Sequence, residues 1–89
     1  MKRAHVLYKG NVQGVGFRFT TVNTAKNFNI NGWVKNLPTG EVEVVAEGLE
    51  SELKEFLNSL EQRMSGYIQD KDVSWKESTN EFASFDVRY

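Results

Sequence analysis

The feature of this sequence that most constrains its fold is the spacing of its hydrophobic residues. The spacing switches between the two-residue period of strands and the 3.6-residue period of helices. We expect a strand over residues 5–12, a helix from Phe17, strands over 32–36 and 41–47, a helix over 50–64, and strands over 67–78 and 85–89. Turn residues at 37–40 predict a hairpin between the second and third strands. The chain therefore follows a βαββαβ order with a short final strand.

The second helix has the stronger pattern. Between residues 50 and 64, apolar residues recur at the i, i+3, i+4 and i+7 positions of an amphipathic helix. In the first helix, Phe19, Val22 and Phe28 fall on one face. A βαββαβ chain makes an antiparallel sheet with both helices on one face. The predicted fold is therefore α+β, a ferredoxin-like sandwich in which the second strand lies at the sheet edge beyond the third.

Composition excludes several classes of function. The chain has 89 residues with 11 Lys and Arg against 12 Asp and Glu. It therefore has no overall positive charge that would attract nucleic acid without sequence specificity. It has no cysteine and one histidine, which excludes disulfide frameworks and thiolate or multi-histidine metal sites. No apolar run approaches the ~20 residues of a membrane span. We expect a single free-standing domain over residues 1–89, a cytoplasmic monomer without metal, cofactor, nucleic-acid or membrane partners.

A glycine-rich segment, "GNVQGVGFRF" at residues 10–19, follows the first strand and leads into the first helix. Glycines at 14 and 16 would let successive N–H groups turn inward, and a helix N-terminus favours an anion. Arg18 could close such a site with a bidentate guanidinium. No acidic residue occurs before Glu41, so this part of the chain is locally basic. The alternative is that the glycines serve only a tight turn and that Arg18 is a solvated surface charge.

A second segment, "GWVKN" at residues 32–36, ends the second strand before the hairpin turn. Asn36 could form a local hydrogen bond to the turn backbone. It could instead use its amide to position a water molecule. Spacing alone does not decide whether Asn36 reaches the glycine-rich loop.

These two segments resemble the signature motifs of the acylphosphatase family. Residues 10–18 and 32–42, followed by Gly48, occur in the family's order and spacing, and the resemblance covers nearly the whole chain. It implies the ferredoxin-like fold and the hydrolysis of acyl phosphates to a carboxylate and inorganic phosphate. It also implies that Arg18 binds the phosphate and that Asn36 orients the nucleophilic water. The loop of Gln13, Gly14, Val15, Gly16 and Phe17 would supply backbone donors to the substrate.

This chemistry needs few side chains. The leaving group is a carboxylate, which is stable without protonation, so no general acid is required, and positioning with electrostatics carries most of the catalysis. An RNA-binding module is an alternative because βαββαβ is also the order of the RRM fold, but the aromatic residues that an RRM needs on its sheet face are missing. A regulatory anion-binding domain, or a part of a larger enzyme, is a second alternative.

Overall fold

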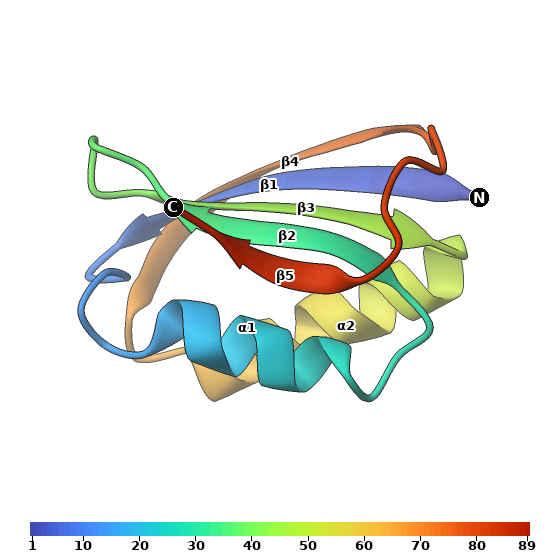
Figure 1. Cartoon of the computed structure of the whole chain (residues 1–89). Helices are drawn as coiled ribbons and strands as arrows, with labels where there is room; N and C mark the ends of the chain where they lie inside the picture. The colour runs from blue at the N-terminus through green and yellow to red at the C-terminus, as the bar shows by residue number, and fades with distance from the viewer.

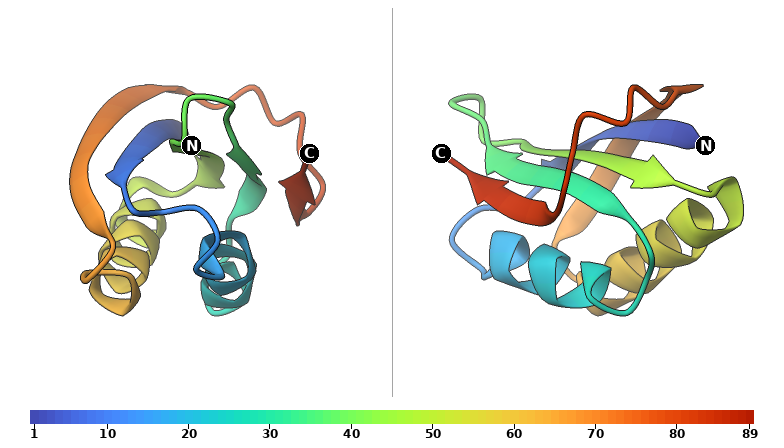
Figure 2. Two further views of the ribbon diagram at one scale, coloured as in Figure 1. Left: turned by 90° about the vertical axis from the view of Figure 1, so that its left-hand side faces the viewer. Right: turned by 45° about the vertical axis from the view of Figure 1, so that its right-hand side comes forward.

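The computed structural model describes residues 1–89 and contains the predicted elements in the predicted order (Figure 1). The strands are β1 (Lys2–Gly10), β2 (Asn31–Asn36), β3 (Val42–Gly48), β4 (Ile68–Glu77) and β5 (Phe85–Arg88). The helices are α1 (Phe17–Ala25) and α2 (Glu50–Arg63). Both helices lie under one face of the sheet, which arches over them (Figures 1 and 2). The ferredoxin-like fold is confirmed. Neither helix is long and apolar enough to cross a membrane.

The sheet has the order β4-β1-β3-β2-β5 and is mixed. The pairs β1–β3, β1–β4 and β2–β3 are antiparallel as predicted, whereas β5 runs parallel to β2. The predictions of a wholly antiparallel sheet and of β2 as an edge strand were therefore wrong. β4 ends at the side of the sheet where β2 begins. Residues 78–84 connect the end of β4 to the start of β5 on that same side of the sheet. β5 then runs alongside β2 in the same direction.

One hydrophobic core lies between the sheet and the helices. All three central strands and both helices contribute to it, and its largest fully buried side chains include Val6, Tyr8, Val12, Phe17, Val34, Val42, Val44, Leu53, Phe56 and Leu60. Tyr8 is fully buried, and its hydroxyl donates a hydrogen bond of 2.9 Å to Glu61 Oε2. Burial of the phenol, together with the adjacent Glu61 carboxylate, raises the pKa of Tyr8.

Helix α1 does not bury the face that contains Phe19. Its buried residues are Phe17, Thr21, Thr24 and Ala25, while the Phe19 side chain is 72% exposed. The two threonines tolerate burial because their hydroxyls donate to carbonyls one turn earlier, Thr21 to Phe17 O and Thr24 to Thr20 O, both at 2.7 Å. Thr21 and Thr24 thus lie on the core face of α1, and the aromatic Phe19 lies at the surface.

The crossover between β4 and β5 is fastened to the sheet by the carboxylate of Glu47, which is only 5% exposed. Glu47 accepts hydrogen bonds from Arg3 Nε at 2.7 Å, from Thr79 N at 2.9 Å and from Asn80 N at 3.0 Å. Burial alone would raise the pKa of Glu47, but hydrogen bonds from Thr79 N, Arg3 and Ser78, together with the charge of Arg3, lower it to about 2. The fastening fixes the segment that delivers β5 to its place beside β2.

Candidate active site

The loop between β1 and α1 turns on two glycines in the left-handed region. Gly14 has a φ of 78° and Gly16 a φ of 77°, values that residues with a Cβ rarely adopt. A Cβ at either position would have no heavy atom within 4 Å. The need for glycine here is therefore conformational, and the space above the loop is open.

This loop presents backbone N–H groups that bond to no protein acceptor. Gly16 is the N-cap of α1 and supplies no side-chain cap. No hydrogen bond of the turns and loops uses an N–H of residues 13–18 as its donor. A helix N-terminus also carries partial positive charge. Free donors and a helix dipole together make this loop suited to an anion.

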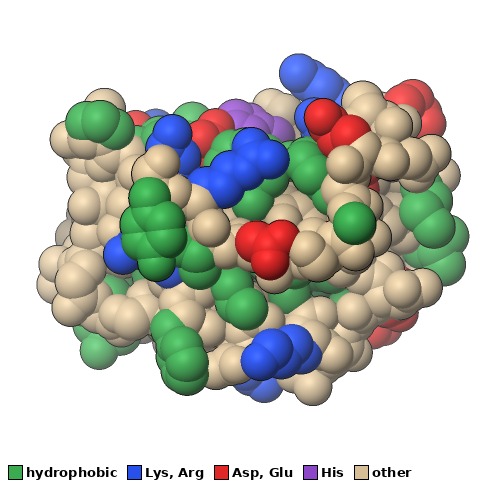
Figure 3. All heavy atoms as spheres, viewed as in Figure 1, with side chains coloured by type: hydrophobic (Ala, Val, Ile, Leu, Met, Phe, Trp, Pro, Cys, Tyr) green, Lys and Arg blue, Asp and Glu red, His purple; other side chains and the backbone are tan.

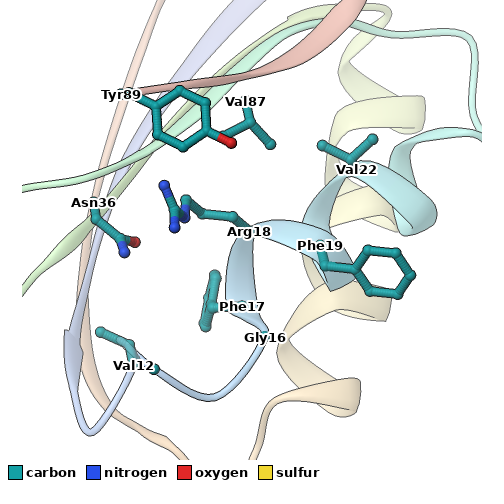
Figure 4. Close-up of a pocket in the computed structure, with 10 residues that line it drawn as sticks. Val12, Gly16, Phe17, Arg18, Phe19, Val22, Asn36, Val87 and Tyr89 are labelled. Atoms are coloured by element: carbon teal, nitrogen blue, oxygen red, sulfur yellow. The ribbon is translucent and has the colours of Figure 1, made fainter.

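Arg18 extends from the first turn of α1 into the space above the loop (Figure 4). Its guanidinium carbon lies 5.0 Å from the ring centroid of Tyr89, within cation–π range. None of the ion pairs between side chains involves Arg18. A positive charge is therefore held in place by an aromatic ring and is not neutralised by a carboxylate.

Asn36 is the last residue of β2, and its amide faces the same space as the Arg18 guanidinium (Figure 4). Its Oδ1 is buried and has no hydrogen-bond partner. Native proteins satisfy almost all such atoms, so an unpartnered buried acceptor beside a cavity needs a functional explanation. Asn36 Oδ1 therefore does not accept a hydrogen bond from the turn backbone, which was the alternative role for this residue.

A cavity of about 380 Å³ joins these groups. Of the predicted site residues, Gly14, Gly16, Phe17, Arg18 and Asn36 line it. The other lining residues are Val12, Phe19, Val22, Val87 and Tyr89. In the space-filling view, hydrophobic side chains reach the surface over α1 and over the end of β5 (Figure 3), the two elements that supply Phe19, Val87 and Tyr89 to the lining.

Gln13 and Val15 belong to the same loop but do not line the cavity. The Gln13 amide donates hydrogen bonds to Leu37 O at 2.8 Å and to Glu41 O at 2.9 Å, which ties the loop to the β2–β3 hairpin. Val15 packs against the hydrophobic core. Both side chains hold the loop in position, and neither faces the space beside Arg18.

Sequence reasoning missed the contribution of β5 to this cavity. The β2–β5 register pairs Val34 with Val87 and ends with Lys35 and Arg88. The next residues on the two strands are Asn36 and Tyr89, and alternation puts them on the same face as Val34 and Val87. The alternation of residues 85, 87 and 89 was visible in the sequence, but the parallel pairing with β2 was not.

No group of three or more His, Cys, Asp and Glu side chains comes together as a metal site. The single histidine, His5, lies on β1 and has its Nε2 2.7 Å from Glu43 Oε2, and it does not line the cavity. The site consists of one guanidinium, one amide and a set of backbone N–H groups. Such groups can bind a phosphoryl group and orient a neutral nucleophile.

Comparison with known proteins links the chain to one family. The family model for acylphosphatases matches residues 4–87. A curated acylphosphatase from Syntrophus aciditrophicus (strain SB) is 43% identical over 90 residues, covering 100% of this chain and 94% of that relative. The crystal structure of an acylphosphatase from Bacillus subtilis is 31% identical with a TM-score of 0.90, and each chain is covered in full. HypF of T. kodakarensis, 29% identical with a TM-score of 0.84, matches 99% of this chain in 12% of its own length.

Proposed function

Because the chain belongs to the acylphosphatase family and is thus a hydrolase of acyl phosphates, we propose that Arg18 and the backbone loop 13–17 hold the substrate phosphoryl group while Asn36 orients the attacking water. The observation that supports these roles most directly is the buried, unpartnered Oδ1 of Asn36 beside the cavity that Arg18 lines. A water molecule between the Asn36 amide and a bound phosphoryl group would satisfy that acceptor.

The proposed reaction needs no covalent intermediate. The water oxygen attacks phosphorus, the bond from phosphorus to the acyl oxygen breaks, and the carboxylate leaves with the bonding electron pair. The products are a carboxylate and inorganic phosphate, and the water protons pass to phosphate and solvent. Phosphoryl transfer of this kind spreads charge over three equatorial oxygens in a loose transition state. The N–H groups of the loop and the Arg18 guanidinium would stabilise that charge.

The energetic contribution of each group follows from its chemistry. One preorganised donor aimed at developing charge contributes about 3–4 kcal/mol, or ~10²–10³ in rate. Arg18 has a permanent charge and two parallel N–H donors, so its contribution should be at least as large. Asn36 contributes by holding the water in line with the bond that breaks.

An RNA-binding function is less well supported. On β1 and β3, the sheet face opposite the helices carries Arg3, His5, Leu7 and Lys9 from β1 and Glu43, Val45 and Glu47 from β3. None of these is Phe, Tyr or Trp, the residues on which an RRM stacks its bases. We further propose that residues 1–89 act as one domain, as a cytoplasmic monomer, and without metal or cofactor.

The test is the hydrolysis of benzoyl phosphate in excess chelator, followed by its ultraviolet absorbance. We expect turnover by the wild type and a loss of at least ~10² in kcat/KM for Arg18→Lys, because an ammonium group cannot make the bidentate contact. Asn36→Ala should lose turnover while inorganic phosphate still inhibits the residual activity competitively. Arg88→Lys is the matched control, because its guanidinium lies over Trp33 and not in the cavity.

Two results would contradict these assignments. Retention of more than about a tenth of the rate by Arg18→Lys would show that bidentate binding is not needed. A large loss of phosphate affinity in Asn36→Ala would show that Asn36 binds the phosphoryl group and does not orient water.

A further inference from the structure

Besides the part lined by Arg18 and Asn36, the cavity has a second region whose lining is apolar. In Figure 4, Arg18 lies between Asn36 on one side and Val22 and Val87 on the other. Phe19 borders this second region at its outer rim, where its ring turns toward solvent (Figure 4). We refer to Phe19, Val22 and Val87 as the apolar wall. All three line the cavity, and they come from two elements, α1 and β5.

No charged side chain other than Arg18 lies beside the apolar wall in this cavity. Arg18 is the only charged residue that lines the cavity. Lys35 and Arg88 are next to site residues in sequence, but they pair with each other in the β2–β5 register and alternate with Asn36. The Arg88 guanidinium lies 4.7 Å from the Trp33 ring centroid on that other face. A ligand with a second anionic group would find no second cation in this cavity.

Phe19 is a large apolar side chain that stands at the surface, at the mouth of the cavity. Its side chain is 72% exposed, although it lies on a helix whose other large aromatic residue, Phe17, is 2% exposed. Val22 and Val87 are only partly buried and pack at the margin of the core. Contiguous apolar surface at the mouth of a cavity is typical of a site that contacts an apolar part of a ligand.

The geometry of the reaction assigns this surface to one part of the substrate. In phosphoryl transfer, the attacking and leaving oxygens lie roughly in line on opposite sides of phosphorus. If Asn36 orients the water, the leaving carboxylate lies on the side of the phosphoryl group away from Asn36. The residues on that side of Arg18 include Val22 and Val87 of the apolar wall, and the Tyr89 ring lies above Arg18 (Figure 4).

We propose that the apolar wall is an acyl-binding subsite and that the enzyme prefers acyl phosphates whose acyl group is uncharged and apolar. This inference rests on the proposed function of Arg18 and Asn36. It narrows the substrate class, because small polar or doubly charged acyl phosphates would gain nothing from the wall.

The experiment compares kcat/KM for benzoyl phosphate and acetyl phosphate in the wild type, Phe19→Ala, Val22→Thr and the control Leu49→Ala. Leu49 is also an exposed apolar residue, 55% exposed, but it lies outside the cavity. We expect the wild type to favour benzoyl phosphate by about tenfold, as partial burial of an aromatic ring on apolar surface predicts. Phe19→Ala should lower this ratio by about threefold to tenfold, and Leu49→Ala should leave it unchanged.

Val22→Thr keeps the branched shape of the side chain and introduces a hydroxyl, so it tests polarity without leaving a large gap. It should lower the same ratio. Competitive inhibition by phenylphosphonate and methylphosphonate gives a readout of binding alone. The wild type should bind phenylphosphonate more tightly, and the advantage should shrink in both variants.

The outcomes separate this inference from the proposed function. If both substrates are hydrolysed in an Arg18-dependent manner but the ratio is the same in the wild type and the wall variants, the subsite is wrong and the proposed function stands. If neither substrate is hydrolysed by the folded wild type, the proposed function and the subsite are both wrong. A wild type that favours acetyl phosphate would also overturn the subsite.

Discussion

The Gln13 side chain should control the site without touching the substrate. Its amide donates to Leu37 O at 2.8 Å and to Glu41 O at 2.9 Å, and it is partly buried between the loop and the hairpin. Each neutral hydrogen bond contributes about 1 kcal/mol net, so Gln13→Ala should cost about 2 kcal/mol of unfolding free energy. For a domain of this size, that loss lowers Tm by about 10 °C.

The functional effect follows from geometry. The two bonds hold the anion-binding loop against the hairpin that begins after Asn36. A displacement of about 1 Å in a site that works by positioning can cost ~10² in rate. We therefore expect kcat/KM of Gln13→Ala to fall by between about tenfold and a hundredfold. Gln62→Ala, an exposed glutamine of α2, is the control.

Thermal unfolding and benzoyl phosphate hydrolysis measured on the same samples test this reasoning. A Gln13→Ala variant with wild-type Tm and with kcat/KM within about twofold of wild type would refute it. A variant with wild-type Tm but greatly weakened inhibition by phosphate would show instead that Gln13 binds the anion directly.

Three further predictions concern stability and metal dependence. The pKa of Glu47 is about 2 in the folded protein and ordinarily 4.5, so its stabilisation is complete above pH 4.5 and is lost as the pH falls toward 2. Urea unfolding across this range should show a flatter pH dependence for Glu47→Gln, and an unchanged slope would contradict the role of this carboxylate. Tyr8→Phe should lower the free energy of unfolding by about 1 kcal/mol through loss of its hydrogen bond to Glu61, and an unchanged urea midpoint would count against that bond. Dialysis against chelator should leave benzoyl phosphate hydrolysis unchanged, whereas a loss restored by a divalent cation would show a metal requirement.

The sequence predicts the order of elements because hydrophobic period and turn chemistry are local properties. The amphipathic pattern of 50–64 corresponds to α2, and the turn at 37–40 does join β2 to β3. The glycines at 14 and 16 adopt positive φ values, a conformation that glycine reaches without strain. These features depend on residues close together in the chain, so they can be read without knowledge of the tertiary structure.

Features that depend on distant residues could not be read in the same way. Phe19 is exposed because Thr21 and Thr24 satisfy their hydroxyls within α1 and take the core face, which hydrophobicity alone does not predict. The Gln13 side chain turns away from the loop because two hairpin carbonyls are within reach. The place of Tyr89 beside Arg18 depends on the parallel pairing of β5 with β2.

The pairing pattern of β1 has a consequence for how the chain acquires its structure. In the sheet, Lys2 is paired with Gly48 on one side and with Glu77 on the other. Such distant partners make loop closure the slow step, so folding should be slower than that of helical bundles of similar length. Helical signal can rise early from local contacts, but the cavity requires β5 to reach β2. Recovery of catalytic activity during refolding is therefore a reporter of the pairing between β2 and β5, and it should lag behind the circular dichroism of the helices.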